Sequence, residues 1–310
     1  MNTGKLDILT IGHILVDIRI QVDHIPGPDD EARIIMETRG VGGSAANVAI
    51  AAKRLGATSG VVAKIGLDDF GRIAVDGLMR EGVDITGLSV SLTRRTGFSI
   101  VSMNPQGSIA IYSYKGAAEG LEPMDLPVHL LSRARHVHIA SLRPDTSLKA
   151  AKAARMAGTT VSWDPGRVLA RRGLQRLSEM IRNVDIVLVN RREAESLTGV
   201  GGPVEAARLI HDLGPTMVVV KLGGEGALIL HKGRVYRVRA FKPERVVDTT
   251  GAGDAFAAGL MVGLLRGYSV EKAGIYASLV ASLKVARLGS HEAPSQGEVL
   301  EAARRAGLEL

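Results

Sequence analysis

The regular alternation of short apolar segments with helical segments constrains the fold of this chain more than any other feature. In the second half of the chain, strand-like segments cover residues 136–140, 160–164, 185–190 and 216–221. Helical patterns lie between them, at residues 146–157, 174–181, 192–198 and 204–213. Strands that alternate with helices of this length form right-handed crossovers. We therefore expect an α/β fold with a mostly parallel central sheet and helices on both faces.

The first half of the chain begins with the same pattern. Residues 6–11 and 59–65 have the short apolar composition of buried strands. Helical composition follows each of them, at residues 45–55 and 70–81. At the other end of the sequence, two final helices are expected to close the chain, at about residues 254–266 and 270–286.

Two segments, 18–39 and 96–115, break the pattern because they alternate polar and apolar residues as β-hairpins do. Pro26-Gly27-Pro28 marks the turn in the first and Pro105-Gln106-Gly107 the turn in the second. We expect them to form one small sheet outside the main one, suited to act as a lid. The chain is then a single domain, residues 1–310, whose core comprises about residues 1–17, 40–95 and 116–310.

Charge and composition bear on the partners of the protein. The formal charge of +7 suggests nucleic acid, but Lys and Arg are scattered and aromatic residues, on which bases could stack, make up only 3%. A basic surface for phosphorylated small molecules explains the charge better. No apolar run has the length of a membrane span, and residues 1–5 lead directly into a strand without a signal-peptide core. Because cysteine is absent, the chain has no disulfides, and we expect a cytoplasmic protein. Neither nucleic acid nor a membrane is expected as a partner.

The sharpest motif is a seven-residue run at a strand-to-helix transition, Asp248-Thr249-Thr250-Gly251-Ala252-Gly253-Asp254. A Gly-Ala-Gly turn that enters a helix leaves several backbone N–H groups unpaired and directed at one point. This is an anion hole, suited to a phosphoryl group in its transition state. Asp254 lies beside it and could accept a proton as general base. Read alone, Asp254 would more often be a simple cap or first-turn acid of a helix, and the seven matching positions change that weighting.

A second motif opens the first helix of the chain, Gly42-Gly43-Ser44-Ala45-Ala46-Asn47. The glycines allow the backbone to approach a sugar closely, and Asn47 offers donors and an acceptor to hydroxyl groups. The same stretch fits the loose dinucleotide-binding pattern, which would indicate a dehydrogenase. That pattern requires an acidic residue at the end of the next strand, whereas Asp68-Asp69 lies beyond Gly66 in a turn. The sequence also contains no P-loop motif.

Together the two motifs resemble the signatures of the ribokinase (PfkB-type carbohydrate kinase) family, and the resemblance extends over essentially the whole chain. It implies a ribokinase-like fold and a kinase that moves the terminal phosphoryl group of ATP to a primary hydroxyl. Mg²⁺ is the implied cofactor. The catalytic groups implied are Asp254 as the base and the amides of Gly251, Ala252 and Gly253.

The same resemblance implies binding residues. Substrate hydroxyls would contact Asp17, Gly42, Gly43 and Asn47, and Arg167 in the segment Trp163-Asp164-Pro165-Gly166-Arg167 could hold a phosphate or carboxylate. The nucleotide would contact Asn190, Lys221, Gly223, Gly224, Gly226 and Ser278. Lys221 stands where threonine is usual, and could add a positive charge near the nucleotide.

Two residues are implied in cation binding. Glu193, in the segment Asn190-Arg191-Arg192-Glu193, would position Mg²⁺ through water. Asp248 matches the position that helps to hold an activating monovalent cation, such as K⁺, in several members of the family. The other ligands of that cation would be backbone atoms at about residues 284–289.

The acceptor is the least constrained part of the prediction. Leu15 stands where ribokinases carry an asparagine, and the motifs as a set resemble archaeal nucleoside kinases. We therefore expect a ribosyl substrate, with a nucleoside ahead of ribose. A base needs an aromatic platform, and the lid offers only Phe98, Tyr112 and Tyr114.

Three alternatives remain open. A phosphorylated sugar such as ribose 1-phosphate is one alternative, because several arginines of the lid and nearby loops could bind its phosphate. These are Arg33, Arg39, Arg94, Arg95 and Arg143. Another sugar or a sugar acid is a further acceptor. A non-catalytic sugar-binding protein is disfavoured because Asp254 and the glycine turn are both present. Exposed edges of the lid sheet would pair between subunits, so we expect a homodimer.

Overall fold

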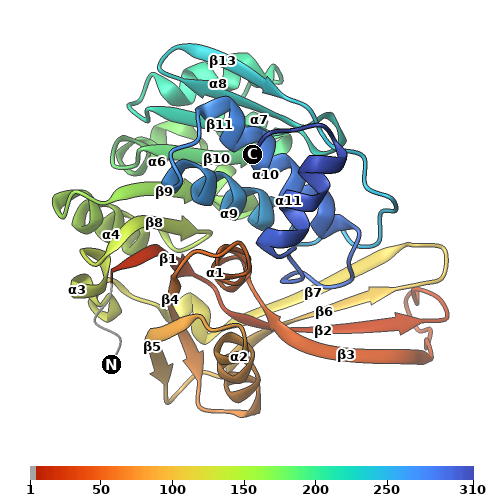
Figure 1. Cartoon of the computed structure of the whole chain (residues 1–310). Coiled ribbons are helices and arrows are strands. Elements are labelled where there is room, and N and C mark those ends of the chain that lie inside the picture. Colours follow the sequence, from red (N-terminus) through yellow and green to blue (C-terminus); the bar gives the residue numbers. More distant parts are fainter. Residues whose placement is uncertain (1–4) are drawn as a thin grey trace.

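The computed structural model describes residues 5–310, and most of its strands form one nine-stranded sheet (Figure 1). The strand order is β13-β12-β11-β10-β9-β8-β1-β4-β5. All strands are parallel except β12 and β13, which run antiparallel at one edge. Their bounds are Leu6–Gly12 (β1), Ser59–Gly66 (β4), Asp84–Ser91 (β5), Ala134–Ala140 (β8), Thr160–Asp164 (β9), Ile186–Asn190 (β10), Met217–Lys221 (β11), Ala227–His231 (β12) and Arg234–Val238 (β13).

Helices cover both faces of this sheet, as its apolar strands require. One face packs on α4 (Pro144–Met156), α6 (Gly173–Arg182), α7 (Arg191–Thr198) and α8 (Pro203–His211). The other packs on α1 (Ser44–Arg54), α9 (Ala252–Leu265), α10 (Val270–Val285) and α11 (Gln296–Arg305). The remaining helices are α2 (Asp69–Arg80), α3 (Val128–Leu131), α5 (Gly166–Ala170) and the 3₁₀ turns Ala117–Gly120, Pro123–Asp125 and Gly223–Glu225.

A separate four-stranded sheet projects to one side of the core, at the lower right of Figure 1. It consists of β3 (Ile34–Gly42), β2 (Leu15–Val22), β6 (Thr96–Met103) and β7 (Ile109–Gly116), in that order. Two antiparallel hairpins, β2–β3 and β6–β7, are joined by a parallel pairing of β2 with β6. The hairpins lie in the two segments whose alternating sequence predicted a small second sheet, which we call the lid.

The two faces of the lid carry different residues because side chains alternate along each strand. Asp17 on β2 pairs with Ser99 on β6, and both side chains are on the face toward the core loop that contains Ser290. Phe98 and Tyr114 are one residue out of phase with Ser99 and Ser113, so they lie on the opposite face. There the ring of Phe98 contacts those of Tyr114 and of Phe70 on α2.

The structure confirms the strands and helices predicted from the sequence, and the ends of the core elements shift by at most two residues. The first lid hairpin, predicted at residues 18–39, spans residues 15–42. One expectation was wrong: the chain does not close with two helices, because α11 follows them. Its start carries the capping box of Ser295 and Glu298, a pattern that sequence alone displays. Strands β5, β12 and β13 were also not predicted. The last two form a hairpin whose turn, Lys232-Gly233, has positive φ at both residues.

Small residues bring α9 and α10 close together. A Cβ at Gly259 would lie 2.9 Å from the Cα of Ala277, and one at Gly263 would lie 3.1 Å from that of Ala273. Because α9 is buried along most of its length, its first turn is held in a fixed position beside the sheet. Among residues 5–310, no helix combines the length and the apolar character that crossing a membrane requires.

Candidate active site

The first turn of α9 makes a backbone anion hole. Gly251, which precedes the helix, has a φ of 77°, in the left-handed region. A Cβ at this position would lie 2.0 Å from the carbonyl oxygen of Ser290, so any other residue would displace that loop. The N–H groups of the first turn have no acceptor within the helix, and the helix dipole adds positive potential at this end. The turn can therefore hold a phosphoryl group.

Asp254 lies in that first turn, and Asn47 Nδ2 donates a hydrogen bond of 2.8 Å to its Oδ2 atom. The residue keeps some contact with solvent, while protein atoms surround its carboxyl group. Burial raises the pKa of Asp254 to about 6, the hydrogen bond from Asn47 opposes this, and the nearby carboxylate of Asp164 adds to it. A carboxylate with a pKa near 6 is ionised at neutral pH and is a stronger base than an ordinary one.

This pKa predicts the acid limb of the pH profile. If Asp254 accepts the proton of the substrate, the protonated form is inactive. Because its pKa is raised to about 6, kcat/KM should fall by about tenfold per pH unit below that value. A steady-state profile between pH 4.5 and 8, values that flank this pKa by roughly two units, checks the expectation, with circular dichroism to verify folding at each pH. A limb near the ordinary aspartate pKa would contradict the assignment.

Asn47 is directed at the same point from the first turn of α1. Its Oδ1 atom is buried and has no hydrogen-bond partner among the residues that the structure describes. A buried carbonyl oxygen without a donor is uncommon in folded proteins. A hydroxyl group of a ligand could donate to it beside Asp254. Gly43, which precedes α1, has a φ of 91°, and a Cβ there would meet the carbonyl oxygen of His13 at 2.4 Å.

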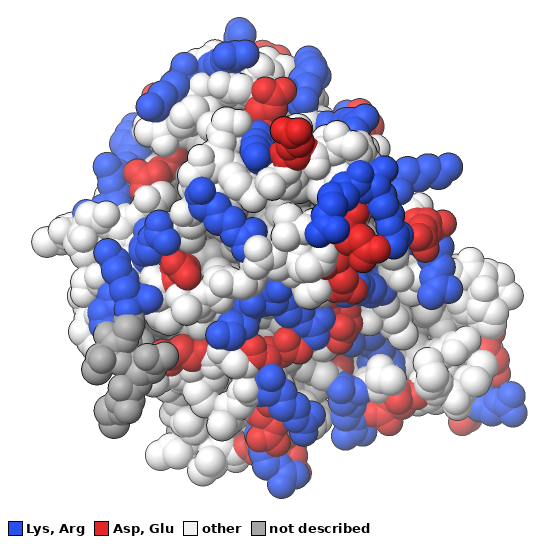
Figure 2. Space-filling model, in the orientation of Figure 1, with Lys and Arg blue, Asp and Glu red and all other residues white. Residues whose placement is uncertain are grey.

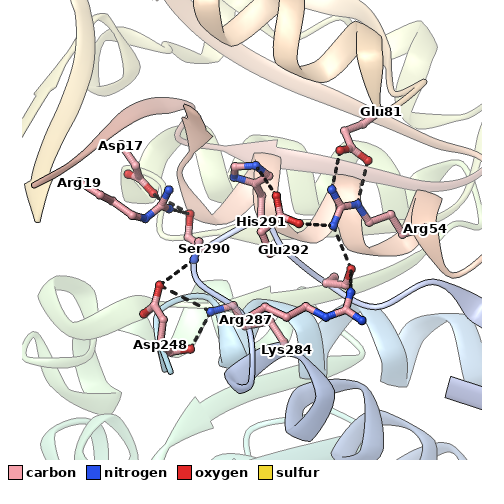
Figure 3. Close-up of polar contacts among 12 residues, drawn as sticks. Asp17, Arg19, Arg54, Glu81, Asp248, Lys284, Arg287, Ser290, His291 and Glu292 are labelled. Atoms are coloured by element: carbon pink, nitrogen blue, oxygen red, sulfur yellow. Dashed lines mark hydrogen bonds and ion pairs between the residues drawn. The ribbon is translucent and has the colours of Figure 1, made fainter. Parts of the chain in front are cut away.

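Asp17 is buried at the junction of the lid with the core (Figure 3). Ser99 donates to its Oδ1 atom, and Ser290 and Arg19 donate to Oδ2, at 2.6, 2.6 and 3.1 Å. A carboxylate can accept about four hydrogen bonds, so capacity for a substrate hydroxyl remains. The space of a Cβ at Gly42 is filled by this carboxyl group, at 2.3 Å. Gly42 is therefore required by the packing of Asp17, whichever ligand binds.

Two basic residues near Asp17 were not predicted from the sequence. Lys115 follows Ser113 by two positions on β7, so its side chain is on the Asp17 face, and the carboxylate of Asp17 acts on its pKa. Burial nevertheless lowers the pKa of Lys115 overall. Burial and the charge of Lys115 lower the pKa of His13 to about 4, so that this imidazole is neutral at pH 7. Lys115 and Arg19 thus supply the positive charge near Asp17, and the neutral His13 does not add to it.

The opposite end of the site contains the predicted nucleotide residues. Asn190 and Glu193 form a reciprocal capping box at the start of α7, with bonds of 2.9 and 2.8 Å. Burial and the Asp164 carboxylate raise the pKa of Glu193 above its ordinary value. Arg167, on α5, is close enough to lower that pKa, so it lies on the Glu193 side of the site.

Lys221 connects the two ends of the site. Its Nζ atom donates a hydrogen bond of 2.7 Å to Asp164 Oδ2 and would lie 3.2 Å from a Cβ at Gly253, against the anion hole. Burial alone would lower the pKa of Lys221, but the carboxylates of Asp164 and Glu193 outweigh it and raise the pKa. The lysine therefore remains protonated beside the point where a phosphoryl group would bind.

The glycines after Lys221 differ in their surroundings. Gly223 and Gly224 have open space where a Cβ would be, as a phosphate-binding turn requires. At Gly226 a Cβ would meet the carbonyl oxygen of Val238 at 2.0 Å, so this glycine is needed for the fold. Ser278, on α10, is buried and donates to the carbonyl of Arg239. The hydroxyl proton of Ser278 is thus engaged within the protein, and the side chain could contact a nucleotide without donating a hydrogen bond to it.

The carboxylates fit a magnesium ion that is bound mainly through phosphate and water. No group of three metal-ligating side chains occurs in residues 5–310. Glu193 and Asp164 lie near each other, however, because the charge of Asp164 raises the pKa of Glu193. Mg²⁺ typically uses one or two carboxylates, substrate phosphates and water. This pair, beside the anion hole, fits that role.

Asp248 precedes the anion hole and is nearly buried. Its Oδ1 atom accepts from the N–H of Thr250 at 2.8 Å, and its Oδ2 atom accepts from the N–H of Gly289 at 3.0 Å. The ammonium group of Lys284 donates to its carbonyl oxygen at 2.7 Å (Figure 3). These bonds hold the motif loop against the end of α10.

The aromatic residues suggested for the acceptor lie on the lid face away from Asp17, and three of the suggested arginines pair with acidic residues. Phe98 and Tyr114 are on the outer face of the lid, and Tyr112, two positions before Tyr114, shares that face. Arg39 forms an ion pair with Glu37. Arg143 pairs with Asp145 and Glu122, and Arg95 is 3.8 Å from Asp68.

The chain is similar to proteins named as sugar and nucleoside kinases. A family model described as pfkB family carbohydrate kinase matches residues 5–296. An ATP-dependent ribose-1-phosphate kinase of Halopiger xanaduensis is 34% identical over 94% of this chain and 96% of its own length. A nucleoside kinase of Methanothermobacter thermautotrophicus is 31% identical over 95% of this chain and 94% of its own length.

A solved structure has the same fold. Ribokinase of Arabidopsis thaliana, complexed with ribose and ATP, superposes with a TM-score of 0.86 and 25% identity. The match covers 96% of this chain and 98% of that one.

Proposed function

The chain belongs to the pfkB family of carbohydrate kinases, and we propose that it transfers the terminal phosphoryl group of ATP to the primary hydroxyl of a ribose-containing substrate. The observation that carries the proposal is the meeting of three groups at one point: the anion hole at Gly251, the carboxylate of Asp254 and the unpartnered oxygen of Asn47. Together they supply a phosphoryl site, a base and a hydroxyl acceptor.

Asp254 would act as the general base. As the substrate oxygen forms its bond to the terminal phosphorus, the proton of that hydroxyl moves to the Asp254 carboxylate. The bond between this phosphorus and the bridging oxygen breaks, and its electron pair leaves with ADP. Asn47 would accept from a substrate hydroxyl and hold Asp254 in position through its amide group. Asp17 would accept from another hydroxyl.

Charge on the transferring group would be stabilised by the amides of residues 251–253 and by Lys221. Kinases of this family use ATP with Mg²⁺. Here Glu193, with Asp164, would hold that ion largely through water, and the ion would neutralise phosphate charge. The open turn at Gly223 and Gly224 would receive the phosphates of the nucleotide. Asn190 and Gly226 would shape that turn, and Ser278 would form part of its wall.

The lid, predicted at residues 18–39 and 96–115 and formed by strands within residues 15–42 and 96–116, would cover the substrate and exclude water during transfer. The rest of the chain would form the core of a single kinase domain. Apolar side chains on the lid remain about half exposed, and they include Ile34, Ile35, Met36, Ile109 and Ile111. An exposed apolar sheet supports the proposal that two copies pair through their lids. Sedimentation velocity would detect the dimer, and a monomer at micromolar concentration would contradict it.

For the acceptor, the arrangement supports a sugar phosphate or a free sugar over a nucleoside. The aromatic residues that could stack a base are on the lid face away from Asp17. Arg19 and Lys115, in contrast, are near Asp17 and could bind an anionic substituent. This specific observation favours ribose 1-phosphate as the acceptor, ahead of ribose and nucleosides.

A coupled phosphotransfer assay with ATP and Mg²⁺ tests both parts of the proposal. The acceptors are ribose 1-phosphate, ribose, cytidine, adenosine, inosine, fructose and a keto-deoxy sugar acid. Turnover should be highest with ribose 1-phosphate, and Lys115→Met should raise KM for it more than KM for ribose. Preference for a nucleoside would overturn the choice of acceptor. Absence of turnover with every acceptor, and with ADP as an alternative donor, would contradict the kinase proposal and favour a non-catalytic binding protein.

A further inference from the structure

A buried lysine lies where the sequence predicted a monovalent cation. Lys284 is in the last turn of α10, and its side chain is 0% exposed. Its Nζ atom donates to the carbonyl oxygen of Asp248 at 2.7 Å and is 3.8 Å from the Asp248 Oδ2 atom. Figure 3 shows this amino group directed at Asp248. The sequence had suggested only backbone atoms of this segment as ligands, so the side chain is the unexpected feature.

Several oxygen atoms around Asp248 already accept a donor, and the ammonium group of Lys284 is one of these donors. Both carboxylate oxygens of Asp248 accept backbone N–H groups, and its carbonyl accepts the ammonium group. The carbonyl of Val285 accepts from the N–H groups of Val247 and Asp248, at 2.8 and 3.1 Å. The carbonyl of Lys284 accepts from Arg287 at 2.9 Å. While the ammonium group is in place, it lies at the Asp248 carbonyl where a K⁺ ion would have to bind, and its charge would repel that ion.

The adjoining space is also unsuited to a cation. A cavity of about 50 Å³ borders Asp248, and most of its lining is apolar, including Val101, Met103 and Leu288. Arg19 is the charged side chain on its other side, and its positive charge also acts on Lys284. A further cation here would be close to the positive charges of Arg19 and Lys284.

We propose that the ammonium group of Lys284 permanently replaces a dissociable monovalent cation beside Asp248, so that this protein needs no K⁺. An ammonium group has the charge of K⁺ and a similar size, and it is held by the chain instead of being bound from solution. The inference rests on the proposed kinase function for its catalytic consequence, but its structural part does not.

The ammonium group would act on the reaction through the motif loop. It fixes Asp248, whose carboxylate holds the N–H groups of Thr250 and Gly289. Next to Gly289, the carbonyl of Ser290 lies directly against Gly251, where the anion hole begins. Lys284 is thus a positioning residue for the anion hole. Without it, the loop would lose its cation, and a site for one would open.

The test compares K⁺ with tetramethylammonium at equal ionic strength, for the wild type and for Lys284→Met. Met keeps the apolar stem and removes only the charge. Lys272→Met, at the other end of α10, is the matched control, since its ammonium group lies over the ring of Tyr268. Two readouts are used, which are the turnover number and the midpoint of thermal unfolding.

We expect K⁺ to change neither readout in the wild type or in Lys272→Met. In Lys284→Met, turnover should fall by about tenfold or more without K⁺ and recover with K⁺ or NH₄⁺. The unfolding midpoint of this variant should rise by about 2 °C or more with K⁺, because the ion now binds only the folded chain.

Activation or stabilisation of the wild type by K⁺ would overturn the inference, and this measurement does not depend on whether the variant folds. A folded Lys284→Met that responds to neither K⁺ nor NH₄⁺ would also overturn it. If the wild type shows no phosphotransfer with any acceptor, the proposed function fails, and the unfolding midpoints still decide the question of the cation.

Discussion

The Asp254→Asn variant should lose on the order of 10²–10⁴ in turnover, because it removes the base that accepts the proton of the attacking hydroxyl. Its stability should move in the other direction. Burial raises the pKa of Asp254, so the ionised form opposes folding above the ordinary aspartate pKa, most strongly above about pH 6. At pH 7 a neutral asparagine should therefore unfold at the same temperature as the wild type or higher.

The control for Asp254→Asn is Asp69→Asn, since Asp69 is also an acid in the first turn of a helix but is exposed. It should keep full turnover. Nucleotide binding, measured by calorimetry, should survive in both variants. If Asp254 were only a helix-terminal acid, Asp254→Asn would keep turnover near that of Asp69→Asn, and the assignment of the base would be wrong.

The Lys221→Met variant should lose about 10²–10³ in turnover, comparable to the loss of one donor to a developing anion. The ammonium group lies against the anion hole, at Gly253, and near Asp254. Its charge holds the pKa of Asp254 down, so its removal should also move the acid limb of the pH profile upward. That displacement is a signature that a merely structural lysine would not give.

Removal of Lys221 also leaves Asp164 without its ion-pair partner, so the two effects must be separated. In an Asp164→Asn background, Lys221→Met should still reduce turnover by about tenfold or more. Lys152→Met, which breaks only an exposed ion pair with Glu179, should leave turnover unchanged. If Lys221 mattered only as the partner of Asp164, the double variant would be no worse than Asp164→Asn.

The parts of the molecule that sequence could predict are those with local signals. The alternation of strands and helices predicted the core sheet, and the turn residues predicted the lid hairpins. The glycine turn at Gly251 and the acid at Asp254 were recognisable because they stand at a fixed spacing from each other, directly before and within the first turn of a predicted helix. Strand β5 was missed because Asp84, Thr86 and Gly87 interrupt its apolar pattern.

The parts that could not be predicted depend on contacts between distant segments. Asp17 is fixed by Ser99 and Ser290, which lie 82 and 273 residues away in the chain. Lys284 had no sequence signal, because a lysine in the last turn of a helix is ordinarily a solvated residue near the helix dipole. Only the packing of α10 against the motif loop buries it.

The surface agrees with the expectation drawn from the scattered charges. Figure 2 shows Lys and Arg side chains interspersed with Asp and Glu over the visible face of the core. Extended single-sign surfaces are the usual feature of nucleic-acid binders. The visible face of the molecule shows none.

The decisive measurement is ³¹P NMR of the wild-type protein incubated with Mg²⁺, ATP and ribose 1-phosphate, with Asp254→Asn in parallel. The proposal predicts ADP together with a new phosphomonoester signal split by two methylene protons, which identifies phosphorylation at the primary hydroxyl. The variant should give almost none of it. Inorganic phosphate without a new ester, an ester at a secondary hydroxyl, or equal product from Asp254→Asn would contradict the proposal.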